Sequence, residues 1–151
     1  MSYPVSKNAR DSYLRERVMK ASPGELVVMM YDGAIQALQG AKGCGENLAK
    51  YTELLTKAQK IVAELASSLK PEKDPVVSKN LLALYDYIYS RLVQICLEGT
   101  VEEIDEVINL LVSLKDSWNE ALIKAKKEGT LPERAFTNVK ETRSSHFTLQ
   151  A

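Results

Sequence analysis

Carboxylate pairs at helical spacing are the residues of this sequence that come nearest to a chemical site. Glu102 and Glu106 stand one turn apart on a predicted helix, so both side chains lie on one face and could bind a metal ion. A di-metal helical bundle, however, takes ligands from inward-facing Glu-x-x-His motifs. The only histidine, His146, lies near the C-terminal end, outside every predicted helix. The sequence therefore predicts no metal site.

Motifs for nucleophilic catalysis and phosphate binding are also missing from the sequence. It contains no glycine-rich phosphate loop, and no Ser or Cys has a credible histidine base. Cys44 and Cys96 fit neither a disulfide framework nor a metal spacing, so we expect reduced thiols, with Cys96 packed in the core. Asp32, inside an apolar run, either has a functional role or hydrogen-bonds within the fold, and we favour the second. We expect a protein that is not an enzyme and uses no cofactor.

The balance of charges argues against nucleic acid and membranes as partners. The 151 residues include 20 Lys and Arg and 20 Asp and Glu, so the formal net charge is zero. Such a chain has no overall basic field to attract polyanions. No apolar run approaches the roughly 18 residues that a membrane span requires, and the N-terminus has no apolar signal region. We expect one cytoplasmic domain without membrane insertion.

Helical periodicity then defines the elements that must position any binding site. Ser22 with Glu25, and Thr100 with Glu103, form capping boxes at two helix starts, and Gly129 is a typical helix end. Together with the apolar repeats, these signals predict four long helices, at about residues 23–42, 47–69, 76–97 and 100–129. Short connections and the absence of a strand pattern predict an all-α, antiparallel four-helix bundle.

The same signals divide the chain into three parts. Residues 21–129 form the bundle, and residues 1–20 are a flexible N-terminal segment containing a short helix that could act as a lid. Residues 130–151 are polar and mixed in composition, and we expect a disordered tail there.

Two of the predicted helices carry more apolar surface than one bundle seam can bury. Residues 26–31 are apolar nearly all round their helix, and the segment 76–97 has a second apolar shoulder beside its core face. Broad apolar surfaces rich in Tyr and Met commonly form grooves for amphipathic helices or peptides. On periodicity alone, a peptide groove and a homodimer face remain alternatives.

Several stretches, in order and at matching spacing, resemble the flagellin export chaperone family (FliS). The opening stretch ASPGELVVMMYDGAI at 21–35 follows Tyr13 and Val18 as in that family's leader. LTKAQKI at 55–61 is similar to the second helix of the family, and NLLALYDYIYSRLV at 80–93 is similar to its most characteristic segment. Trp118 stands where the fourth helix carries its tryptophan. The glycine-rich junction at 43–45 and the segment 130–151 depart from the pattern.

The resemblance implies an ATP-independent chaperone of the bacterial cytosol. Such a protein holds the disordered C-terminal segment of flagellin, prevents premature polymerisation and presents the segment to the type III export apparatus of the flagellum. Export-gate or assembly-regulator proteins are implied as further partners, and a monomer or weak homodimer is expected when the chaperone is free. A self-associating bundle, or a regulator of another flagellar assembly protein, is the alternative.

The residues expected to bind flagellin follow from the resemblance and from the apolar patterns together. A mobile lid over the empty groove is expected from Tyr13, Leu14 and Val18. The groove walls are expected to include Met29, Tyr31, Leu82, Tyr89, Val93 and Leu97. Four residues are assigned to the core instead: Leu84, Ile88, Leu92 and Leu111. Arg91 and Asp32 either pair with each other or anchor the peptide backbone.

Overall fold

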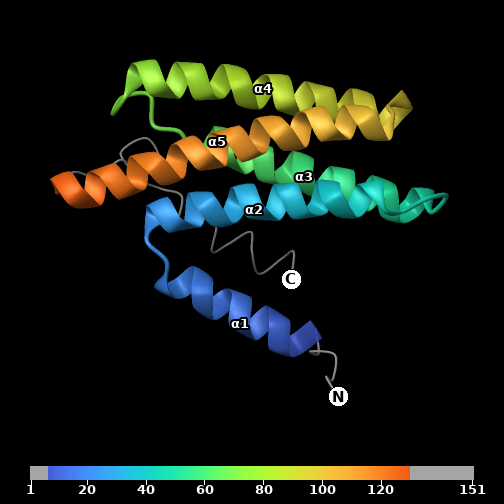
Figure 1. Cartoon of the computed structure of the whole chain (residues 1–151), viewed down its shortest axis with the longest axis horizontal. Helices are drawn as coiled ribbons and strands as arrows, with labels where there is room; N and C mark the ends of the chain where they lie inside the picture. Colours follow the sequence, from blue (N-terminus) through green and yellow to red (C-terminus); the bar gives the residue numbers. More distant parts are fainter. Residues whose placement is uncertain (1–6, 130–151) are drawn as a thin grey trace.

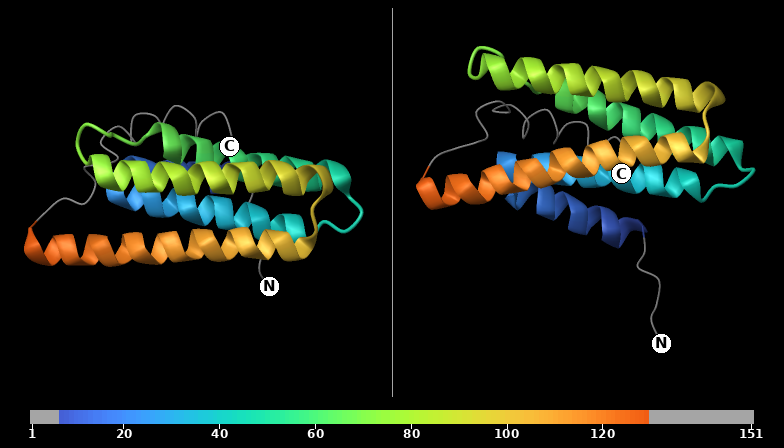
Figure 2. Two further views of the ribbon diagram at one scale, coloured as in Figure 1. Left: turned by 90° about the horizontal axis from the view of Figure 1, so that it is seen from above. Right: turned by 45° about the horizontal axis from the view of Figure 1, so that its top comes forward.

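The computed structural model describes residues 7–129, and the part of the chain within these bounds is entirely helical. Its elements are α1 (Lys7–Lys20), α2 (Pro23–Lys42), α3 (Leu48–Ser67), α4 (Pro75–Glu98) and α5 (Val101–Glu128). Helices α2 to α5 lie side by side, and α1 diverges from α2 outside the bundle (Figures 1 and 2). The predicted four-helix bundle with a short N-terminal helix is therefore confirmed. The expectation of a disordered tail at 130–151 lies outside the described residues.

The helix ends follow the signals in the sequence. The backbone N–H of Glu25 donates to Ser22 Oγ at 3.2 Å, and the N–H of Ser22 donates back to Glu25 Oε2 at 3.4 Å, so the first capping box is confirmed. At the start of α5, the N–H of Thr100 donates to Glu103 Oε2 at 3.0 Å. Gly129 ends α5 with a φ of 70°, the left-handed conformation that favours glycine.

Helix α2 is the centre of the bundle. It packs against α3 and α5, α3 packs in turn against α4, and α4 meets α5 more sparsely. A Cβ atom on Gly33 would lie only 3.3 Å from Cδ1 of Ile61, so this glycine lets α2 and α3 approach closely. The residues of α2 that are buried point in many directions: Gly24, Leu26, Val27, Met30, Tyr31, Ala34, Ile35, Ala37, Leu38 and Ala41. The expectation that this helix is covered nearly all round is confirmed.

The core assignments on α4 and α5 are correct at three of four positions. Ile88, Leu92 and Leu111 are fully buried. Leu84 is 38% exposed, so its assignment to the core is wrong. The core side of α4 is centred on Tyr85, Ile88 and Leu92, and Leu84 lies at the edge of this face.

Candidate partner-binding surfaces

The nine residues expected to bind flagellin lie in three places. Four are near the junction of α1 with α2, namely Tyr13, Leu14, Val18 and Met29. Four more lie on one face of α4 and are called the α4 row: Leu82, Tyr89, Val93 and Leu97. The ninth, Tyr31, lies in the core. The structure therefore does not gather the predicted set into a single groove.

The α4 row is an exposed apolar stripe beside α3. Its spacing of seven, four and four residues keeps the four side chains on one side of the helix, away from the bundle axis. Leu82 is 42% exposed and Leu97 is 81% exposed, and Tyr89 and Val93 are exposed as well. An apolar stripe of this kind, four helical turns long, offers a matching surface to an amphipathic helix.

A groove between α3 and α4 adjoins the α4 row. This α3–α4 groove has a volume of about 390 Å³ and contains two members of the row, Leu82 and Tyr89. Ala63, Ala66 and Ser67 form much of its α3 side, and these small residues let a ligand approach the helix closely. The predicted second apolar shoulder is thus a surface feature, open along the α3 side of α4.

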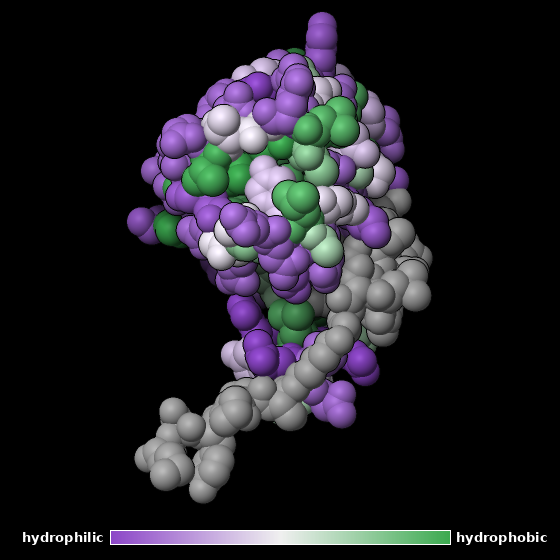
Figure 3. Space-filling model, turned by 90° about the vertical axis from the view of Figure 1, so that its right-hand side faces the viewer, coloured by the Kyte–Doolittle hydropathy of each residue, from purple (hydrophilic) through white to green (hydrophobic). Residues whose placement is uncertain are grey.

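Apolar side chains also gather at the end of the bundle where α4 leads into α5. Leu48, Leu97 and Val101 are exposed there. Figure 3, which faces this end, shows apolar patches separated by polar side chains. The α4 row therefore continues at Leu97 into a mixed surface at the end of the bundle.

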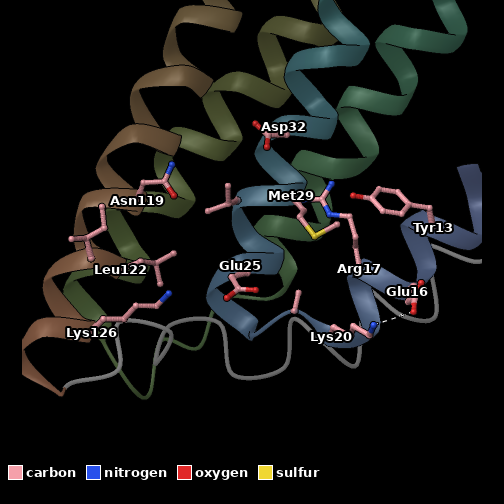
Figure 4. Close-up of a pocket in the computed structure, with 13 residues that line it drawn as sticks. Tyr13, Glu16, Arg17, Lys20, Glu25, Met29, Asp32, Asn119, Leu122 and Lys126 are labelled. Atoms are coloured by element: carbon pink, nitrogen blue, oxygen red, sulfur yellow. Dashed lines mark hydrogen bonds and ion pairs between the residues drawn. The ribbon is translucent and has the colours of Figure 1, made fainter. Parts of the chain in front are cut away.

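A further groove lies between α1, α2 and α5 and is shown in Figure 4. Its volume is about 500 Å³. Apolar side chains from α2 and α5 form its floor: Val28, Met29, Leu122 and Ile123. Charged side chains from all three helices surround this floor: Glu16, Arg17, Lys20, Glu25, Asp32 and Lys126. This α1–α2–α5 groove combines an apolar floor with a rim of both charge signs.

Helix α1 meets the bundle chiefly through its C-terminal end. Val18 is 3% exposed and Leu14 is half-buried, whereas Tyr13 is 63% exposed. The guanidinium of Arg17 lies 5.9 Å from the centre of the Tyr13 ring, a cation–π arrangement on the outer part of the helix. The lid role of these residues stays a prediction.

Tyr31 does not lie on a groove wall, so its predicted position there is wrong. Its side chain is 1% exposed, and its hydroxyl lies 2.6 Å from the hydroxyl of Tyr85. Burial raises the pKa of Tyr31 to about 12, although the hydrogen bond with Tyr85 opposes the shift. Burial, followed by the proximity of Tyr31, also raises the pKa of Tyr85. The two phenols form a neutral polar link inside the core.

The suggested pair of Arg91 with Asp32 is wrong, because each residue has a different partner. Asp32 pairs with Lys115 of α5. Arg91 donates from Nη2 to Glu106 Oε2 at 3.0 Å, and Glu106 also accepts from the Tyr87 hydroxyl at 2.8 Å. These two hydrogen bonds, with that of Tyr87 the larger influence, lower the pKa of the Glu106 carboxyl. Glu106 thus fastens α4 to α5 where these helices meet sparsely.

Sequence reasoning missed this cluster of Tyr87, Arg91 and Glu106. Tyr87 and Arg91 are four residues apart and share a side of α4, which is the one signal that could have paired them with an acidic partner. The sequence also did not predict the partner of Trp118. The Nε1–H of Trp118 donates to the backbone oxygen of Gly24 at 2.9 Å. That bond holds α5 to the first turn of α2.

Residues 7–129 contain neither a metal-binding cluster nor a membrane-spanning helix. No group of three or more His, Cys, Asp or Glu side chains in this range could hold a metal ion. Among the described helices, none is long and apolar enough to span a bilayer.

Comparison with known proteins identifies relatives along most of the chain. The profile of a family described as "Flagellar protein FliS" matches residues 6–126. The chain is 32% identical to the flagellar secretion chaperone FliS of Bacillus subtilis (strain 168) over 124 residues, 81% of this chain and 92% of that protein. It is 38% identical to the flagellar secretion chaperone FliS of Salmonella typhimurium over 112 residues, 72% of this chain and 82% of the relative. The protein of that name from Escherichia coli (strain K12) is 32% identical over 115 residues, 70% and 80% of the two chains.

Proposed function

Because this chain belongs to the FliS family of flagellar proteins, we propose that it is an ATP-independent export chaperone for flagellin. It binds the C-terminal segment of flagellin in the bacterial cytosol, prevents premature polymerisation and delivers the segment to the flagellar type III export apparatus. The observation that carries the proposal is the α4 row, an apolar stripe that the bundle leaves uncovered beside the α3–α4 groove.

The α4 row has the dimensions of a site for an amphipathic helix. Leu82 and Leu97 are fifteen residues apart, which corresponds to about 22 Å along α4. A flagellin segment that becomes helical on binding buries its apolar face here, and ordering the segment consumes part of the contact energy. A large contact surface is therefore compatible with release of the cargo. No step of this process needs a catalytic residue or a cofactor.

The proposal also covers the α1–α2–α5 groove, where Met29 lies on the floor and Tyr13 on the rim. Wrapping from the α4 row to this groove would let one extended segment contact the bundle on more than one side. Leu14 and Val18, on the same short helix, then belong to the element that such a segment meets or displaces.

The test compares two leucines on the same helix. Leu82 and Leu84 have similar exposure, 42% and 38%, but only Leu82 lies in the α3–α4 groove. In calorimetric titration with the flagellin C-terminal segment of the same organism, Leu82→Ser should weaken binding roughly 10- to 100-fold, the equivalent of about 1.5–3 kcal/mol of lost apolar burial. Leu84→Ser is the control and should bind as the unmodified protein does.

Equal losses in the two variants would contradict this use of the α4 row. No binding by the unmodified protein, with a segment shown to be competent, would contradict the chaperone function itself. The alternative is a self-associating bundle or a regulator of another flagellar assembly protein. Self-association through the α4 row predicts a dimer in sedimentation that Leu82→Ser converts to monomer.

A further inference from the structure

The α1–α2–α5 groove is an open apolar channel directly beside the end of α5. Figure 4 shows Leu122 and Lys126 of α5 on one side and Tyr13 and Arg17 of α1 on the other, with Met29 between them. Ile123, also on α5, is 57% exposed. Helix α1 does not close the channel, because only its C-terminal end is buried against the bundle. Val28 and Met29 are half-buried on this floor and Leu122 is 9% exposed, so Ile123 is its most exposed member.

The chain that follows α5 is long enough to reach the channel. Leu122 lies seven residues before Gly129, about 10 Å back along the helix. Phe136 lies seven residues after Gly129, and a chain of this length spans at most about 25 Å. Phe136 can therefore return to the level of Leu122 and Met29 once the chain reverses direction after Gly129, whose left-handed conformation ends the helix.

The composition of the following segment matches the channel. Phe136 supplies a large apolar side chain for the floor. Glu133 precedes it by three residues, and the channel carries Arg17 and Lys126 on opposite sides. Neither of these two cations forms an ion pair with another residue in the range 7–129. Arg134 follows Glu133 directly, and the rim also carries Glu16, Glu25 and Asp32, so each of these two charges of the segment meets opposite charges on the rim.

We propose that residues 130–151 bind back into the α1–α2–α5 groove, with Phe136 against Met29 and Leu122, as an intramolecular occupant. This segment covers the apolar floor when no partner is bound. The regulatory consequence rests on the proposed function: a flagellin segment that uses this groove must displace residues 130–151, which lowers its apparent affinity by the fraction of time that the groove is open.

Photo-cross-linking tests the docking without any flagellin. The full chain carries p-benzoyl-phenylalanine in place of Phe136 and is irradiated at low concentration, and the products are mapped by mass spectrometry. The expected product is a single chain linked from position 136 to the peptide containing Met29 or the peptide containing Leu122. The matched control has the same probe in place of Phe147, which should not give these links.

Three results would overturn the proposal. Links from position 136 to other surfaces, or no links at all, would show that the segment does not enter the groove. Links between two chains would make a second copy the occupant. A probe in place of Tyr3 that links to Met29 when the probe at 136 does not would make residues 1–6 the occupant.

An affinity measurement tests the consequence separately. If the segment occupies the groove nine-tenths of the time, a chain ending at Gly129 should bind the flagellin segment about ten-fold more tightly than the full chain. Equal affinities would overturn the competition. If neither chain binds flagellin, the proposed function fails, but the cross-linking result still decides whether residues 130–151 occupy the groove.

Discussion

The hydroxyls of Tyr31 and Tyr85 lie 2.6 Å apart in the middle of the bundle, each on a side chain that is 1% exposed. They join α2 to α4, two helices that α3 and α5 otherwise separate. A buried hydroxyl without a partner costs stability, and each of these tyrosines supplies the partner for the other. The pair therefore fixes how the two diagonal helices sit relative to each other.

The first prediction is that the two phenols are energetically coupled. Tyr31→Phe leaves the Tyr85 hydroxyl buried without this partner, and Tyr85→Phe does the same to Tyr31. Each single variant should lose about 1–3 kcal/mol of the free energy of unfolding. The double variant should lose clearly less than the sum, because no unpaired hydroxyl remains. Urea unfolding at neutral pH measures the cycle, and additive losses would contradict the coupling.

The second prediction concerns alkaline pH. The pKa of Tyr31 is raised from 10.0 to about 12 by burial. Between these values the unfolded chain releases a proton that the folded chain retains, so the free energy of unfolding should fall as the pH rises from about 10 to about 12. The raised pKa of Tyr85 acts in the same direction. The double Phe variant should show a shallower fall, and parallel pH profiles would refute this explanation.

The third prediction tests the bond between Trp118 and Gly24. Trp118→Phe keeps an aromatic ring on α5 but removes the donor to the Gly24 oxygen. We expect a loss of about 0.5–1.5 kcal/mol in the free energy of unfolding, and faster amide hydrogen exchange in the first turn of α2. Unchanged exchange at this turn would mean that the bond does not hold the helix start.

The helices could be predicted from the sequence because their signals are local. The capping box of Ser22 and Glu25 and the helix end at Gly129 depend on neighbouring residues, and both are found in the structure. The short N-terminal helix and the bundle architecture were predicted for the same reason.

The candidate surfaces were predicted less well, because they depend on where each helix meets its neighbours. Apolar periodicity cannot distinguish Leu82 from Leu84 until the position of α3 is known, and it assigned Leu84 to the core. Tyr31 was placed on a surface because its helix is apolar all round, and only packing shows that this side faces Tyr85. The partner of Asp32 is Lys115, 83 positions away in the sequence, a pairing that no local pattern contains.

The fourth prediction follows from the corrected place of Leu84. Leu92→Ala removes a fully buried side chain and should lower the free energy of unfolding by about 2–5 kcal/mol. Leu84→Ala removes the same atoms from a side chain that is 38% exposed, so its loss should be distinctly smaller. Chemical unfolding of the two variants under one condition makes the comparison. Equal losses in the free energy of unfolding would show that Leu84 contributes to the core as Leu92 does.

The last prediction concerns Glu106, which accepts from Tyr87 and Arg91 across α4 and α5. Its pKa is lowered from 4.5, with the hydrogen bond from Tyr87 as the largest cause. Tyr87→Phe should therefore raise this pKa towards its ordinary value, as followed by the side-chain carboxyl carbon in an NMR titration. Tyr89→Phe is the matched control, because Tyr89 lies on the α3 side of α4 and should leave the titration unchanged.

The lowered pKa of Glu106 also determines how acid should affect the stability of the fold. A carboxyl whose pKa is lowered in the folded state stabilises the fold above its unfolded pKa, and that stabilisation is lost as the pH falls through the folded pKa. Acidification should thus loosen the junction of α4 with α5 in the unmodified protein, and less so in Tyr87→Phe. Hydrogen exchange of the two helices at acidic and neutral pH checks this, and identical pH dependence in both proteins would show that Glu106 does not fasten the junction.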